Sequence, residues 1–105
     1  YKNMILEAAD TSTTLTGEKF GAPVRGIKNE LTKKYHELEE KSSTLMELEE
    51  LTLGSLRRAV YDGDVENGSV MAGQIAGLVS ELRSVKNIIE ETVEEARKVL
   101  RKIEI

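Results

Sequence analysis

The residues best suited to chemistry or binding lie in one stretch, residues 68–77, which reads GSVMAGQIAG. It combines small residues with one uncharged amide, Gln74, and one flexible apolar side chain, Met71. Gly73 and Gly77 are four residues apart, so a helix would place them on one face. Each glycine in a helix costs roughly 1 kcal/mol relative to alanine, so a helix that keeps both predicts a close neighbour for its backbone. That neighbour could be another element of this chain, a second chain or a ligand.

The start of the same stretch predicts a helix N-cap. Gly68 and Ser69 are residue types that favour this position, and the free N–H groups at a helix start can hold an anion. The alternative interpretation is structural, with the small residues forming a packing face that binds nothing. The residue types are compatible with both.

The rest of the chain offers few groups for catalysis. The single histidine, His36, lies among lysines and glutamates of a helical pattern, and we expect it to be a solvated surface residue. The absence of cysteine excludes a disulfide framework and a thiolate metal site. Acids at positions 62, 64 and 66 have the alternation of a calcium loop, but such a loop needs glycine at its sixth position and glutamate at its twelfth. Asn67 and Gly73 stand there instead, so we interpret the acids as turn and cap residues.

Composition limits the class of protein. With 105 residues the chain holds at most one domain with a modest core. It has 15 basic and 19 acidic residues and a formal net charge of -4, which argues against nucleic-acid binding. No apolar run approaches ~18 residues, so no membrane span is predicted, and we expect a cytoplasmic protein. The chain opens on Tyr1 in mid-pattern and without an initiator methionine, which predicts a fragment of a longer protein.

The spacing of apolar residues predicts a mainly helical fold, beginning with a short helix over Tyr1–Ala9. A hydroxyl-rich segment at 10–16 should be extended, with no partner strand in this chain. After Pro23, apolar residues at helical spacing predict a helix from Val24 to Lys41.

Two further helical regions are expected. Thr44 is predicted to cap the apolar pattern between 45 and 60, which Gly54 would divide into two helices. Ser84 is predicted to cap a last helix, whose amphipathic stripe runs from Val85 to Ile103. The outer face of that helix is acidic first and basic last, an order that complements the helix dipole.

The stretch from Gly63 to Val79, GDVENGSVMAGQIAGLV, resembles the carboxy-terminal region of a known family. This is the flavin-dependent enoyl-acyl carrier protein reductase II and nitronate monooxygenase (2-nitropropane dioxygenase) family. The amino half is similar to the reductase branch through residues 1–10, the Thr13-Thr14 segment and residues 20–32. The likeness covers essentially the whole chain, and its specific part is 63–79.

The resemblance implies an FMN-binding TIM barrel (α/β) with a helical region folded over the flavin end. Because a barrel needs roughly 250 residues, residues 1–105 would be only the C-terminal segment, containing the last barrel helix and the helical cover. The barrel strands, the main flavin-phosphate loops and the family's catalytic histidine would then lie outside this chain. His36 does not match the motif of that histidine and does not inherit its role.

The resemblance also implies a reaction. FMN would be reduced by NAD(P)H, and hydride would pass to the β-carbon of an enoyl thioester on acyl carrier protein. The implied partners are the missing N-terminal barrel of the same protein, the acyl carrier protein thioester and a second copy in a homodimer. The full-length parent would be the enzyme, and this segment alone is expected to be inactive.

Met71 and Gln74 are the cofactor-binding residues that we predict from the resemblance. Met71 would be an adaptable apolar wall of the cleft, and Gln74 would offer its amide to the flavin edge. The surrounding small residues would let the backbone approach a flat cofactor. Interior packing is the alternative for both side chains. The nitronate monooxygenase branch and an autonomous helical protein-interaction module are the alternative functions.

Overall fold

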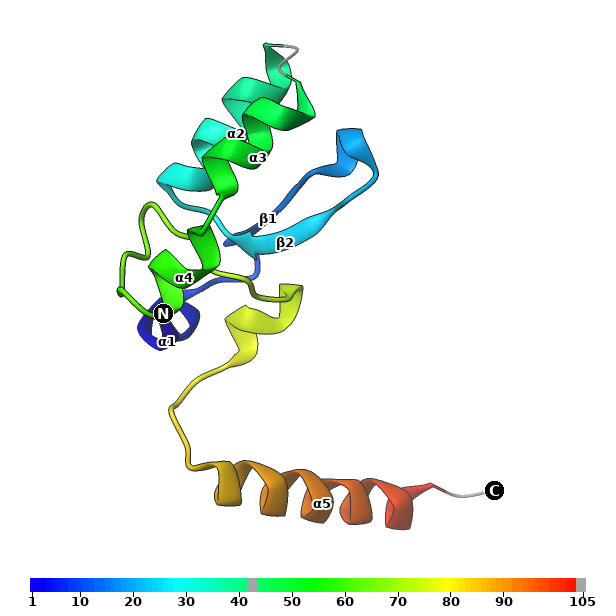
Figure 1. Cartoon of the computed structure of the whole chain (residues 1–105). Helices are drawn as coiled ribbons and strands as arrows, with labels where there is room; N and C mark the ends of the chain where they lie inside the picture. Colours follow the sequence, from blue (N-terminus) through cyan, green and yellow to red (C-terminus); the bar gives the residue numbers. More distant parts are fainter. Residues whose placement is uncertain (42–43, 104–105) are drawn as a thin grey trace.

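The computed structural model describes residues 1–41 and 44–103, and within them the chain is mainly helical, as predicted (Figure 1). The same residues include one two-stranded sheet. In chain order the elements are α1 (Lys2–Glu7), β1 (Thr13–Thr16), η1 (Glu18–Phe20), β2 (Val24–Ile27), α2 (Glu30–Glu40), α3 (Leu45–Thr52), α4 (Ser55–Val60), η2 (Gln74–Leu78) and α5 (Val85–Lys102). No helix among these residues is both long enough and apolar enough to cross a membrane.

The prediction of one helix from Val24 to Lys41 is wrong for its first turns. Strands β1 and β2 form an antiparallel hairpin, in which Thr13 lies opposite Ile27 and Thr16 opposite Val24. The β-branched residues on both strands favour this extended pairing. The hydroxyl-rich segment therefore has a partner strand within this chain, contrary to expectation.

Helix α2 begins at Glu30 because Asn29 caps it. The Thr32 backbone N–H donates to Asn29 Oδ1 at 3.0 Å, and the Asn29 backbone N–H donates to Thr32 Oγ1 at 2.9 Å. These two bonds form a capping box, which satisfies two N–H groups at the helix start. The free amide nitrogen of the same side chain, Nδ2, donates to the backbone carbonyls of Val65 and Gly68, each at 2.7 Å. One side chain thus joins the start of α2 to a loop far along the chain.

The predicted boundaries of the later helices are confirmed. Gly54 has a φ of 70° and separates α3 from α4. Thr44 Oγ1 accepts from the Glu47 backbone N–H at 3.3 Å, and Ser84 Oγ accepts from the Asn87 backbone N–H at 3.1 Å. Both hydroxyls satisfy an N–H group that has no partner inside its helix.

The stretch 68–77 is not the predicted helix. The Ile27 backbone N–H donates to the Val70 carbonyl at 2.8 Å, and Met71 forms an isolated antiparallel bridge with Gly26. Residues 70–72 therefore run beside β2, on the edge that β1 leaves open. Because the β-branched Val70 reaches the core from this position, with only 2% of its surface exposed, the extended backbone is favoured over a helix. Gly68 and Ser69 consequently do not cap a helix.

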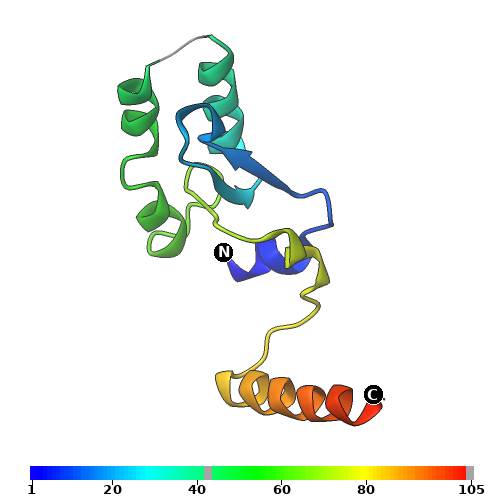
Figure 2. The same ribbon diagram turned by 90° about the vertical axis from the view of Figure 1, so that its right-hand side faces the viewer.

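The core is small, and α5 lies outside it. Its buried cluster is formed by Ile27, Ala59 and Val70. Helix α5 is exposed along its whole length, and Figures 1 and 2 show it set apart from the other elements. Its apolar stripe is present as predicted, yet Ile89 and Leu100 are 59% and 68% exposed. Within the described residues the stripe has no neighbour that covers it.

The Asn29 contacts generate a stability prediction. Asn29→Ala removes the cap and the donors to both loop carbonyls, and it should lower the free energy of unfolding by about 2–3 kcal/mol. Asn29→Asp keeps the cap but points a carboxylate at the two carbonyls, so it should also destabilise the protein at neutral pH. Asn3→Ala, at an exposed position on α1, is the control and should change stability by less than about 0.5 kcal/mol. Urea unfolding followed by circular dichroism measures all three. Wild-type stability of Asn29→Asp would show that the two donors contribute nothing.

Candidate functional site

Two glycines of the stretch 68–77 are needed for internal packing. A Cβ built on Gly68 would lie 2.5 Å from the Ala59 backbone nitrogen and 2.6 Å from the Asp64 carbonyl oxygen. A Cβ on Gly77 would lie 2.7 Å from the Ala9 carbonyl carbon, where η2 packs beside α1 (Figure 2). Both distances are shorter than real Cβ contacts. The structural interpretation of the small residues therefore holds at these two positions.

Gly73 is different. A Cβ built there would meet no heavy atom of the described residues within 4 Å, and its φ of −78° suits any residue. Gly73 and Gly77 do not share a face, because Gly77 packs on the end of α1 while Gly73 faces open space. Neither the backbone conformation nor crowding by residues 1–41 and 44–103 requires a glycine at position 73. Its exposed backbone is free to approach a group outside the described residues.

The backbone of Met71 is held in place, while its side chain reaches the surface. The Tyr1 hydroxyl donates to the Met71 carbonyl at 2.6 Å, and the bridge to Gly26 fixes the other edge of this backbone. Burial raises the pKa of the Tyr1 hydroxyl above its ordinary value, so this donor keeps its proton. The Met71 side chain is 44% exposed and lines a hollow of about 410 Å³. Other apolar side chains on the walls of this hollow are Val24, Leu45 and Leu56.

Gln74 lies three residues further on, as the first residue of η2, and is exposed. Gly73, directly before it, is the N-cap of η2 and has an extended backbone. The structure thus places both predicted residues on one short surface segment, 71–74. Each presents its side chain outside the core, with an apolar group at one end of the segment and an amide at the other.

His36 is more constrained than a solvated surface residue. Its Nε2 lies 3.1 Å from Thr14 Oγ1, and its Nδ1 lies 3.5 Å from the Glu39 carboxylate. The side chain is 38% exposed, so the expectation is only partly right. The ring connects β1 to α2.

Asp64 behaves as the turn residue that the sequence predicts. Its carboxylate accepts from the backbone N–H of Asn67 at 3.1 Å and from the Asn67 side chain at 3.2 Å. These bonds, the backbone one first, lower the pKa of the Asp64 carboxyl below its ordinary value. The turn leads the chain from α4 back toward Gly68.

The sequence analysis missed the contacts between Ser55 and Ser69 that hold the chain just before segment 71–74. The Ser55 and Ser69 hydroxyls lie 2.6 Å apart, and the Ser69 backbone N–H donates to the Ser55 carbonyl at 2.9 Å. No pattern in the sequence indicates this pairing, in which one serine begins α4 and the other lies in the stretch 68–77. Asn29 did carry a signal, because asparagine followed three residues later by Thr32 has the spacing of a capping box.

A family model described as nitronate monooxygenase matches residues 1–95 of the chain. The match includes the hairpin, α2 to α4 and the whole segment that carries Met71, Gly73 and Gln74. The chain therefore belongs to the nitronate monooxygenase family, which confirms the resemblance found in the sequence.

Particular relatives give further detail. The chain is 28% identical over 100 residues to a probable nitronate monooxygenase from Staphylococcus saprophyticus, covering 95% of this chain and 28% of that protein. Among solved structures it is similar to FabK from Thermotoga maritima, with a TM-score of 0.87 and 42% identity, covering 97% of this chain and 32% of that one. A mutant of the same FabK matches with a TM-score of 0.78 and 36% identity, covering 97% and 29%. The chain thus spans about a third or less of the length of these relatives.

The glycine environments generate a paired prediction. Gly68→Ala forces a methyl group into the backbone of α4 and should destabilise the protein by about 2 kcal/mol or more. Gly73→Ala meets nothing and should leave the free energy of unfolding unchanged or raise it by up to about 1 kcal/mol, because alanine restricts the unfolded chain. Urea unfolding of both variants measures the difference. Equal destabilisation by the two substitutions would mean that Gly73 is also packed against this chain.

Proposed function

We propose that this chain is the carboxy-terminal part of an FMN-dependent, NAD(P)H-using enoyl-acyl carrier protein reductase of fatty-acid synthesis. The observation that carries the proposal is the match to FabK, at 42% identity over 97% of the chain, against 28% identity to the probable nitronate monooxygenase. The family model and the name of that curated relative favour a nitronate monooxygenase as the second candidate. A match of this extent to one third of a longer chain supports an enzyme segment over an autonomous interaction module.

The exposed apolar stripe of α5 supports the proposal that a further part of the protein, outside these 105 residues, packs against this helix. A helix that is apolar on one side only normally buries that side. In the proposed enzyme α5 is the last barrel helix, and its stripe covers barrel strands in the preceding part of the protein. The hairpin and α2 to α4 then form the cover over the flavin end. A cytoplasmic homodimer that takes its acyl substrate from acyl carrier protein completes the proposal.

The segment 71–74 fits one edge of a flat cofactor such as FMN. Gly73 leaves room for a group to reach the backbone, because it has no Cβ and no neighbouring atom of the described residues occupies the space. The exposed Gln74 amide supplies a donor and an acceptor for polar atoms on a flavin ring. The half-exposed Met71 supplies an adaptable apolar contact. When bound, FMN supplies the hydride transfer from a nicotinamide to an enoyl thioester.

This chain's own contribution is binding and positioning. The Asn29 bonds to the Val65 and Gly68 carbonyls and the Tyr1 bond to the Met71 carbonyl hold the backbone that leads into the segment, so the start of the segment needs little reordering when a ligand arrives. The apolar walls around Met71 would exclude water from an acyl chain and bind it through apolar contact. Residues for proton transfer come from outside this chain in the proposal.

Substitutions in the full-length protein test the roles of Met71 and Gln74. Met71→Ala should lower kcat/KM for an enoyl thioester by roughly 1–3 kcal/mol, about 5- to 150-fold, while FMN stays bound. Gln74→Leu should weaken FMN retention or slow flavin reduction by the nicotinamide. Met46→Ala is the matched control, because Met46 is 70% exposed on α3 and does not line the hollow. Steady-state kinetics, flavin absorbance and thermal melts are measured together. Lower melting temperatures with unchanged kcat/KM would show that both side chains only pack.

Turnover with different substrates separates the two candidate branches. The full-length protein should oxidise NAD(P)H in the presence of an enoyl thioester, and a nitronate with oxygen should be a poor substrate. The reverse preference would assign the monooxygenase function. The 105-residue chain alone should bind no stoichiometric FMN and oxidise no nicotinamide, and a flavin spectrum that survives gel filtration would contradict this.

A further inference from the structure

A second hollow, of about 380 Å³, shares no lining residue with the hollow beside Met71. It is formed where the start of α2 meets β1 and the end of β2. The residues that line it are Thr14, Lys28, Asn29, Thr32, Lys33 and His36. None is a carboxylate, and two are lysines, although the whole chain is acidic.

The charges around this hollow favour an anion. Neither Lys28 nor Lys33 forms an ion pair with a carboxylate in the part of the chain that is described. The first turn of α2 adds the positive end of an 11-residue helix. Glu39, three residues after His36, is already engaged, because it accepts from the Gly17 N–H at 3.1 Å and lies 3.5 Å from His36 Nδ1.

The other acids of α2 do not line the hollow. At about 100° per residue, Glu30 and Glu37 lie about a quarter turn or more round the helix from the middle of the side that carries Asn29, Thr32, Lys33 and His36. Glu40 lies on that side, one turn beyond His36. Asn29 and Thr32 are committed to the capping box and shape the hollow rather than bind a ligand. The His36 ring is engaged as well, by Thr14 and Glu39, so the groups left for a ligand are the two ammonium groups and the remaining hydrogen-bonding capacity of the Thr14 hydroxyl.

We propose that this hollow binds a phosphate group of a ligand, with Lys28 and Lys33 as the charged contacts and the Thr14 hydroxyl, oriented by His36, as a hydrogen-bonding partner. Lysine ammonium groups are compact charges that commonly bind phosphate. The choice of the molecule that carries the phosphate rests on the proposed function. The two substrates of the proposed enzyme, a nicotinamide dinucleotide and a phosphopantetheine thioester, both carry phosphate.

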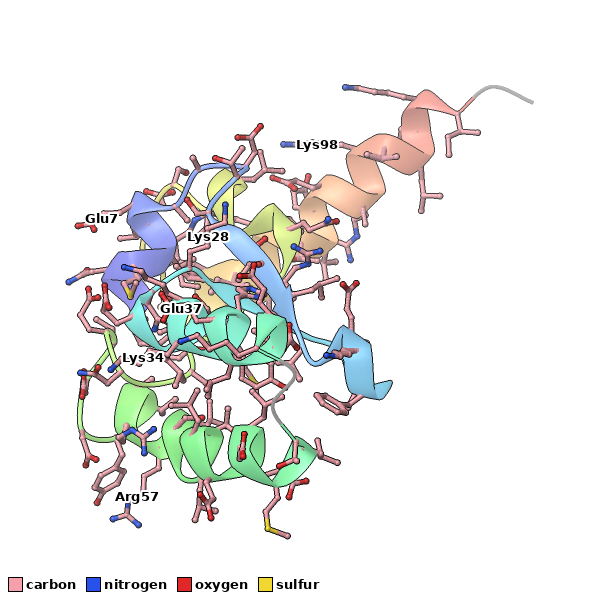
Figure 3. The ribbon with its side chains drawn as sticks, turned by 90° about the horizontal axis from the view of Figure 1, so that it is seen from above. Glu7, Lys28, Lys34, Glu37, Arg57 and Lys98 are labelled. Carbon is pink, nitrogen blue, oxygen red and sulfur yellow. The ribbon has the colours of Figure 1, made fainter. Side chains whose placement is uncertain are left out.

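The binding test uses inorganic pyrophosphate and the full-length, flavin-loaded protein, at constant ionic strength maintained with sodium chloride so that general screening does not change. Lys28→Gln combined with Lys33→Gln removes both charges and keeps the aliphatic stems. Lys34→Gln is the matched control, because Lys34 is exposed and about 150° round α2 from the hollow (Figure 3 labels Lys28 beside the strands and Lys34 along α2). Thermal shift and calorimetric titration report the affinity.

Wild type and Lys34→Gln should bind pyrophosphate with the same affinity, and the double variant should bind it at least about tenfold more weakly at an unchanged melting temperature. Equal affinities in all three proteins, or no saturable binding by wild type, would overturn the site.

Kinetics then identify the source of the phosphate. A raised KM for the nicotinamide in the double variant assigns the hollow to the dinucleotide, and a raised KM for the thioester assigns it to phosphopantetheine. Unchanged KM values for both in an active enzyme would overturn the assignment to a substrate. An inactive protein would contradict the proposed function alone, and pyrophosphate binding would still decide the site.

Discussion

The contact on which this structure most depends is the Asn29 side chain, which joins the start of α2 to the carbonyls of Val65 and Gly68. Those carbonyls belong to the loop that leads into Val70, which lies in the core, and Met71, which lies at the surface. A buried or half-buried carbonyl without a donor is costly, so the two bonds at 2.7 Å set where the loop can run.

The sequence predicted those features that depend on local chemistry. The division at Gly54, the caps at Thr44 and Ser84 and the stripe of α5 all follow from residue types within a few positions of one another. The hairpin was missed because Ile27 lies four residues before Leu31, so the apolar spacing of α2 continues into β2. Pairing with β1 overrides that periodicity, and only the tertiary structure reveals it.

The sequence was sufficient to locate the candidate site in the stretch 68–77, but not to tell which of its glycines is accessible. Glycines in an otherwise apolar stretch indicated close approach of a neighbour, and Gly68 and Gly77 have such neighbours. Gly68 and Gly77 are crowded by Ala59 and Ala9, which are distant from them in sequence. Only the structure could therefore show that Gly73 has free space around it. The proposed function would give this open surface a reason, because backbone without a side chain can approach a flat cofactor closely.

The central claim is that the open backbone at Gly73 and Gln74 faces the flavin of a longer enzyme. Hydrogen exchange of the full-length protein, followed by mass spectrometry with FMN bound and with FMN removed, tests it most directly. Peptides that cover residues 70–77 should exchange more slowly with FMN bound, while peptides from the exposed turn at 61–64 should not change. Equal exchange of residues 70–77 in the two states, in a protein that does bind FMN elsewhere, would contradict the claim.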